Sequence, residues 1–193
     1  MKKILIALML VFLNLHAKEE ILIDSANAYT LTMQDVVIKN SLKDKSKAIL
    51  IFPTVKKVGF VVGGMYGAGV AIVKNSPSWS VYKAEISNAS IGFQIGYEDN
   101  YLVIYIMDDE TLNKVSNSNL KIGVDATASI WEASASAGAV DVFNKNMYAY
   151  VNKKGVFAGA SIGGSVLKID LSSRYSNSYY GYSRLMNAIG KQY

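Results

Sequence analysis

The glycine-rich segment that spans residues 47–73 constrains the fold more than any other part of the chain. It begins with an apolar run that ends at Pro53, continues with the pair Lys56–Lys57, and is then rich in glycine. Proline cannot donate to a central strand ladder, and glycine within a strand marks a bend, a turn or a close backbone approach. The pattern therefore predicts an apolar strand followed by a glycine-rich hairpin that turns at Met65–Tyr66.

The N-terminus has the pattern of a secretory signal peptide. Lys2 and Lys3 precede an unbroken apolar run over residues 4–13, and Ala17 provides a small residue before a cleavage point. The alternative is an uncleaved membrane anchor, but the run is short for a span that needs about 20 residues. We therefore expect residues 1–17 to be removed, and the mature protein to be exported to the periplasm or envelope of a bacterium.

The residue counts exclude most catalytic and metal-based chemistry. The chain has no cysteine, and its single histidine, His16, lies inside the predicted signal peptide. Disulfides, thiol nucleophiles, histidine bases and Cys/His metal sites are therefore not expected in the mature chain. The sequence predicts that the protein is not an enzyme and carries neither a cofactor nor a metal ion.

The charge balance favours anionic partners. The formal net charge is +5, and removing the two lysines at positions 2 and 3 lowers it to +3. This mild excess attracts anionic surfaces without specifying which one. No zinc-finger, RNA-recognition or helix-turn-helix pattern is present, so nucleic acid is not an expected partner.

Local patterns predict most of the remaining elements. Apolar residues at helical spacing predict an amphipathic helix over residues 24–45. The run 101–107 is apolar on both faces and predicts a central buried strand, and Asp108 is placed to cap a short helix that ends near Val115. Residues 121–142 are rich in Ala and Ser and predict two strands, with a helix as the alternative.

The order of these elements, with 15 glycines and 13 tyrosines, indicates a β-rich domain of sufficient length for one core. We expect a single domain over residues 18–193 of the α+β class. In it, an N-terminal helix packs on a strongly curved, mostly antiparallel β-sheet or closed sandwich.

Six short motifs in order resemble the SYLF family, over a region of about residues 30–182. They are Lys47–Val70 with its Phe-Pro, Lys-Lys and Gly-Gly pairs, Ser90–Gly96, Leu102–Asp108, Gly123–Ala126, Tyr148–Ser161 and Tyr179–Gly181. The sequence departs from the family pattern at Met65, where a bulky, often basic residue commonly follows Gly-Gly. The resemblance implies lipid binding, with phosphoinositides in eukaryotic members and actin in the yeast-type branch. For an exported bacterial member, it implies affinity for anionic lipid.

We expect the basic clusters Lys56–Lys57 and Lys153–Lys154 to attract lipid phosphates, with Lys74 as a weaker candidate. Tyr66, Trp79 and Tyr82 are candidates for the headgroup level, where an aromatic ring with a polar edge is favoured. The alternative is that the lysine pairs lie in solvated turns and that the aromatic residues belong to the core or to the ordinary surface.

Two further functions are weighed against lipid binding. A protein-interaction or structural module of the envelope is compatible with every feature above. A small outer-membrane β-barrel fits less well. Its last strand would alternate apolar residues back from the C-terminus, and Asn187 and Lys191 occupy those positions.

Overall fold

The computed structural model describes residues 2–59, 62–75, 78–91, 98–117, 119–126, 128–132, 145–152 and 163–190. The elements in these ranges are α1 (Lys2–Met33), α2 (Lys39–Lys45), β1 (Ala48–Gly59), β2 (Val62–Asn75), β3 (Ser78–Ile91), β4 (Glu98–Ile106), α3 (Asp109–Asn117), β5 (Leu120–Lys121), β6 (Ala128–Glu132), β7 (Met147–Asn152), β8 (Val166–Arg174) and α4 (Tyr180–Ala188).

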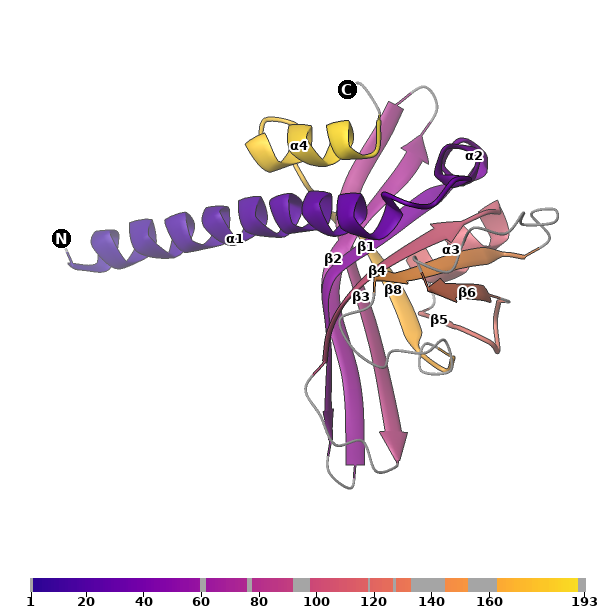
Figure 1. Ribbon diagram of the computed structural model, residues 1–193. Helices are drawn as coiled ribbons and strands as arrows, with labels where there is room; N and C mark the ends of the chain where they lie inside the picture. Colours follow the sequence, from indigo (N-terminus) through magenta and orange to yellow (C-terminus); the bar gives the residue numbers. More distant parts are fainter. Residues whose placement is uncertain are drawn as a thin grey trace.

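The described strands form one curved sheet in the order β5-β8-β3-β2-β1-β4-β7-β6 (Figure 1). Neighbouring strands are antiparallel except for β6 and β7, which run parallel. Helix α1 crosses one face of the sheet with α4 beside it, and the N-terminal half of α1 extends away from the sheet (Figure 1). The predicted α+β class, with an N-terminal helix on a curved, mostly antiparallel sheet, is confirmed.

Two apolar layers lie on opposite faces of the sheet. The helix-covered face packs against α1 and α4, and the inner face lies on the concave side, where α3 contacts β8. Residues 102–106 of β4 are fully buried and alternate between the two layers. This confirms the predicted two-sided strand, because a strand covered on both faces needs apolar residues at successive positions.

The predicted hairpin at Met65–Tyr66 is wrong. Both residues lie inside the continuous strand β2, opposite Lys57 and Lys56 of β1. The glycines of this strand accommodate neighbouring groups: a Cβ atom at Gly67 would lie 2.9 Å from the Ile86 side chain. The glycine-rich pattern predicts a turn, but in this strand glycine permits close packing within the sheet.

The predicted helix over residues 24–45 is divided into α1 and α2 by turns at residues 34–38. This interval contains the run Val36-Val37-Ile38, in which Val36 is buried and Val37 is 80% exposed. Three successive β-branched residues disfavour a continuous helix because their side chains lose χ1 freedom against the preceding turn. The break turns the chain from α1 towards β1.

The segment predicted as two small-residue strands contains β5 and β6, although β5 begins one residue earlier, at Leu120. A turn that includes Gly123, with a φ of 85°, separates them. Residues 133–142 of the predicted segment lie outside the described residues. The motif residues 92–96 also lie outside them.

Asp108 caps α3 as predicted. Its carboxylate accepts hydrogen bonds from the Thr111 backbone N–H at 2.7 Å, the Thr111 hydroxyl at 3.0 Å and the Asn146 side-chain amide at 2.9 Å. Partial burial by itself would raise the pKa of Asp108, but the hydrogen bonds from Thr111 and Asn146 outweigh it. The net pKa lies below the ordinary value of 3.8.

The stabilising contribution of Asp108 is therefore expected to be complete at neutral pH and to disappear as the pH falls through the lowered pKa. We expect Asp108→Ala to lower the free energy of unfolding by about 1 kcal/mol at pH 7, and by less at about pH 2.5, which is below the ordinary carboxyl pKa, so that part of the contribution of the charge is lost. Urea denaturation of both proteins at the two pH values measures the difference. An equal loss at both would contradict the role of the carboxylate charge.

Helix α4 is capped by a side chain from α1 rather than by its own N-cap residue, Tyr179. The Glu19 carboxylate accepts hydrogen bonds from the backbone N–H groups of Tyr180 at 3.1 Å and Gly181 at 2.7 Å. These groups have no partner within the helix, so the contact satisfies donors that every helix start leaves open. The capping contact fixes the position of α1 at Glu19 relative to α4.

Candidate functional site

Two of the predicted site residues lie opposite each other on the helix-covered face, beyond the edge of α1. Lys56 of β1 pairs in register with Tyr66 of β2, and Tyr66 pairs with Ser87 of β3. Lys56 is exposed and Tyr66 is 52% exposed. Their exposure and register place a cation and an aromatic hydroxyl together on the surface of the long three-stranded part of the sheet (Figure 1).

Lys74 and Trp79 lie at the other end of the same face. Tyr66 and Lys74 are eight positions apart in β2, which corresponds to roughly 26 Å along an extended strand. The Lys74 ammonium lies 5.8 Å from the centroid of the Trp79 ring and donates a hydrogen bond to the Asp44 carbonyl. Trp79 is partly buried against the helix-covered layer. The structure therefore does not bring this pair together with Lys56 and Tyr66.

The other predicted residues are not on this surface or are not described. Tyr82 packs against the inner layer, on the opposite face of the sheet. Lys57 occupies the register position opposite Met65, one residue beyond Lys56, and its side chain lies outside the described residues. Lys153 and Lys154 lie outside them altogether, so their association with the first lysine pair stays a prediction.

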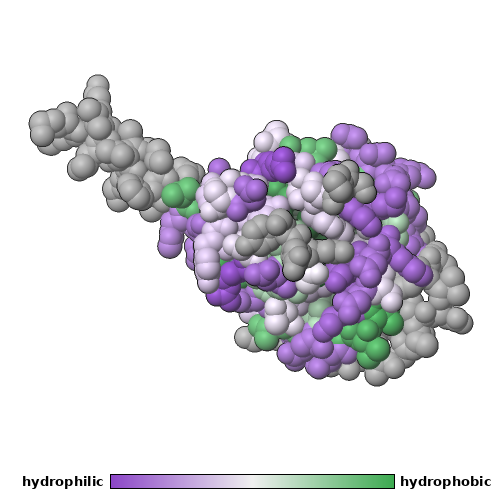
Figure 2. All heavy atoms as spheres, turned by 90° about the horizontal axis from the view of Figure 1, so that it is seen from above, coloured by the Kyte–Doolittle hydropathy of each residue, from purple (hydrophilic) through white to green (hydrophobic). Residues whose placement is uncertain are grey.

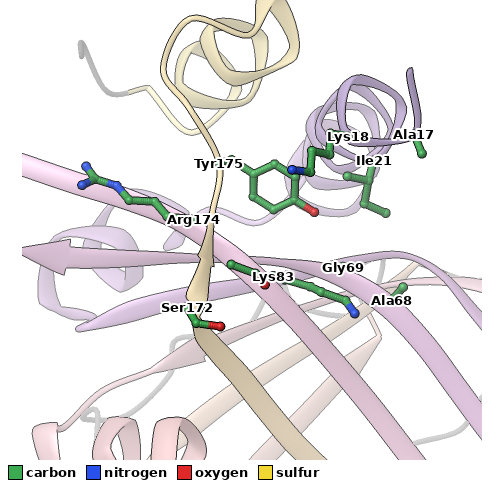
Figure 3. A pocket seen from close by; sticks show the side chains of 10 residues that line it. Ala17, Lys18, Ile21, Ala68, Gly69, Lys83, Ser172, Arg174 and Tyr175 are labelled. Atoms are coloured by element: carbon green, nitrogen blue, oxygen red, sulfur yellow. The ribbon is translucent and has the colours of Figure 1, made fainter. Parts of the chain in front are cut away.

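A cavity of about 630 Å³ opens where α1 meets β2, β3 and the end of β8. Its lining residues are Ala17, Lys18, Ile21, Ala68, Gly69, Lys83, Ser172, Ser173, Arg174 and Tyr175. Lys18 and Tyr175 project towards the opening from different elements, whereas the Arg174 guanidinium points away from Lys18 and Lys83 (Figure 3). The lining contains three cationic side chains and no acidic one.

The charges near the cavity are partly paired. Lys83 donates to Glu85 in a salt bridge of 2.8 Å, and this hydrogen bond raises the pKa of Lys83. Tyr66 and Asp170 act in the same direction. Ala68, two residues along β2 from Tyr66, lines the cavity, so the cavity adjoins the surface that carries Tyr66. Hydrogen bonds from the Ser172 and Ser173 hydroxyls lower the pKa of Asp170 to about 2. Lys18 and Arg174 thus supply positive charge beyond the Lys83–Glu85 pair.

The residues that join Lys56 and Tyr66 at this surface were not found from the sequence. Lys18, Lys83 and Arg174 stand far apart in the chain and share no motif. The register of β2 with β3 and of β3 with β8, together with the path of α1, brings them to one cavity. No local pattern carries this information, because it depends on which strands become neighbours.

Within the described ranges, no three side chains of His, Cys, Asp or Glu gather into a group that could hold a metal ion. The buried Tyr29 and Tyr105 hydroxyls share a hydrogen bond of 3.1 Å between α1 and β4, and burial raises the pKa of both. These tyrosines are therefore neutral at physiological pH and contribute to packing. No helix in the described part has both the length and the apolar character needed to cross a membrane.

Comparison with known proteins gives one family match and several relatives. A family model, Ysc84, described as "Las17-binding protein actin regulator", matches residues 87–188. Protein YSC84 of Saccharomyces cerevisiae is 30% identical over 159 residues, which cover 76% of this chain and 32% of that protein. LAS seventeen-binding protein 3 from the same species is 28% identical over 142 residues, covering 69% and 30%.

Human SH3 domain-containing YSC84-like protein 1 is 27% identical over 138 residues, which cover 69% of this chain and 40% of the human protein. The chain therefore spans about a third of the length of the curated relatives it matches. No solved structure matches the chain.

Proposed function

Because the chain belongs to the Ysc84 family, which is the SYLF family of the sequence resemblance, we propose that it is a non-enzymatic module that binds anionic phospholipid headgroups. The observation that carries this proposal is the cavity with three cations and no acidic lining residue, beside the exposed Lys56 and Tyr66. A phosphodiester is the anion that such a surface meets on a membrane, and each nearby cation contributes about 1 kcal/mol to binding.

The surface supports a peripheral mode of association. On the one face drawn in Figure 2, seen from above, most of the coloured residues are hydrophilic, and the hydrophobic ones form separate small patches. A helix or loop that inserts deeply into the bilayer needs a continuous apolar face. We propose that the protein remains at the headgroup level, held mainly by charge, with Tyr66 as the aromatic contact.

Lys74 and Trp79 have a structural role in this proposal. Their contacts join the β2–β3 end to α2, and the Tyr182 hydroxyl donates to the Trp79 carbonyl from α4. Tyr82 likewise serves the inner layer. Of the predicted aromatic residues, we retain Tyr66, which is exposed, as the candidate for contact with a membrane.

We place the mature protein outside the cytoplasm, as the signal peptide predicts. Leu15, His16, Ala17 and Lys18 are all exposed, and the contacts that fix α1 to α4 begin at Glu19. Removal of residues 1–17 would therefore leave the anchored part of α1 intact.

The double variant Lys56→Gln/Lys83→Gln tests the lipid-binding proposal. Loss of two cations near an anionic surface is expected to weaken binding to vesicles containing phosphatidylglycerol by about 30-fold. Co-sedimentation with neutral and with anionic vesicles, at low and high salt, measures it. Binding by the unaltered protein should require the anionic lipid and weaken with salt.

The matched control is Lys39→Gln/Lys43→Gln on α2, which removes the same charge elsewhere. An equal effect of both double variants would mean that net charge, not this surface, determines binding. A third pair, Lys153→Gln/Lys154→Gln, tests whether the second predicted cluster contributes. Absence of vesicle binding by the unaltered protein would overturn the proposal.

A protein-binding role is the second candidate, and the names of the relatives favour it. The family model is described by Las17 binding and actin regulation, and LAS seventeen-binding protein 3 carries that partner in its name. Because this chain covers about a third of the yeast relatives, the partner need not contact the shared region. Retention of a protein partner by the Lys56→Gln/Lys83→Gln variant, with vesicle binding lost, would separate the two functions.

A further inference from the structure

The peptide bond predicted for cleavage lies in the wall of the cavity. Ala17 and Lys18, the residues on its two sides, both line the cavity, and both are exposed (Figure 3). The next residue, Glu19, is held by the backbone N–H groups at the start of α4. Cleavage would therefore create the new N-terminus next to a fixed point of the fold and at the edge of the candidate site.

The sequence after this bond is suited to begin a helix. As it stands, α1 has no acidic residue in its first turn. A helix that begins at Lys18 has Glu19 and Glu20 in its first turn, where negative side chains are favourable. The part of α1 that packs on the sheet is therefore able to start at Lys18 without the preceding residues.

We propose that hydrolysis of the Ala17–Lys18 bond makes the cavity a stronger anion site, because it removes Ala17 from the wall and leaves the α-ammonium group of Lys18 in its place. The inference rests on the proposed lipid-binding function and on export. Water is the co-reactant: its hydroxyl becomes part of the Ala17 carboxyl group, and its hydrogen goes to the Lys18 nitrogen. An endopeptidase that accepts a small residue before the bond catalyses the step. A terminal amine is mostly protonated at pH 7.

The new charge joins cations that are already fixed by the fold. Lys18 would carry two ammonium groups in a wall shared with Lys83 of β3, whereas the Arg174 guanidinium, from β8, points away from both (Figure 3). The neighbouring acid, Glu19, is engaged by Tyr180 and Gly181 and does not line the cavity. The processed protein would thus bind a phosphate group more strongly than the precursor, so that affinity for anionic lipid develops after export.

Three forms of the otherwise full chain test the proposal. The first begins at Lys18. The second is the same protein after selective transamination of its terminal amine to a carbonyl, which removes the charge and keeps the Lys18 side chain. The third begins at Leu15, so that its terminal amine lies about 4.5 Å further along the helix. Binding is measured with phosphatidylcholine vesicles, with and without phosphatidylglycerol, and thermal midpoints establish that all three are folded.

We expect the form with the free Lys18 amine to bind anionic vesicles about fivefold more tightly than either other form. Soluble glycerol phosphate, at constant ionic strength, is expected to compete with the vesicles because it occupies the cavity. If the vesicles were instead bound by diffuse attraction to the charged surface, glycerol phosphate would not compete. Equal binding by the three forms, or no competition by glycerol phosphate, would overturn the inference and leave membrane binding standing. Loss of vesicle binding in all three would overturn the proposed function as well.

Discussion

Replacing Gly69 with alanine is expected to lower the free energy of unfolding by roughly 3 kcal/mol, the upper end of what overpacking costs. A Cβ atom at this position would overlap the carbonyl oxygen of Ile51 and lie 2.7 Å from the ring of Phe52. Both neighbours belong to the buried centre of β1, and a backbone carbonyl in a paired strand cannot move aside independently. The expected loss is therefore a consequence of backbone displacement.

Gly64→Ala is the matched control in the same strand. A Cβ atom there would lie 3.5 Å from the Asn88 carbonyl oxygen, which is an ordinary contact. Because alanine restricts the unfolded chain more than glycine does, this variant is expected to be neutral or slightly stabilising. Urea denaturation of both variants measures the contrast. Equal stability of the Gly69 and Gly64 variants would show that the close approach of β1 and β2 at Gly69 is not as described.

Elements determined by their own residues were predicted well. The strand β4 is apolar at every position from Leu102 to Ile106, and only burial on both faces is compatible with that pattern. The cap at Asp108 follows from a short-range bond to Thr111. In both cases the information lies within a few residues of the chain, so no knowledge of the tertiary structure was needed.

Elements determined by distant neighbours were predicted less well. The sequence around Met65 suggested a turn because glycine serves turns and close contacts equally well. Only the position of Ile51 beside Gly69 distinguishes the two uses, and that position follows from strand pairing. The end of α1 at Met33 was missed for a related reason: the β-branched run that interrupts the helix has the same apolar periodicity as a helix that continues.

The residues of the candidate site fall into the same two groups, those identified from local sequence and those that depend on distant neighbours. Lys56 and Tyr66 were proposed from local sequence, and the register of β1 and β2 places them side by side. Lys18, Lys83 and Arg174 depend on three long-range contacts and could not be identified before the fold was known. Trp79 was predicted as a site residue but is partly buried against the helix-covered layer. The sequence alone does not distinguish an aromatic residue that contacts a membrane from one that packs in the core.

Gly181→Ala is expected to destabilise the protein by about 2 to 3 kcal/mol. At a solvent-exposed helix position, by contrast, a glycine-to-alanine change stabilises the helix by up to about 1 kcal/mol. A Cβ atom on Gly181 would lie 2.7 Å from the Leu22 Cβ atom and 2.9 Å from the Glu19 carbonyl oxygen. Both atoms are close to the α1 backbone, so α1 and α4 would have to separate. The close packing of α4 against α1 thus explains why glycine occupies the third position of the Tyr-Tyr-Gly sequence.

The sign of the effect makes this prediction specific. Asn187→Ala, at an exposed position of α4, is the control and is expected to be neutral or slightly stabilising through helix propensity. Urea denaturation and vesicle binding are measured on all three proteins. Because Glu19 and Lys18 are adjacent, separating α1 from α4 should also displace Lys18 from the cavity and weaken binding to anionic vesicles. A Gly181→Ala protein as stable as the Asn187→Ala control would contradict the α1–α4 contact, and with it the positioning of Lys18 at the candidate site.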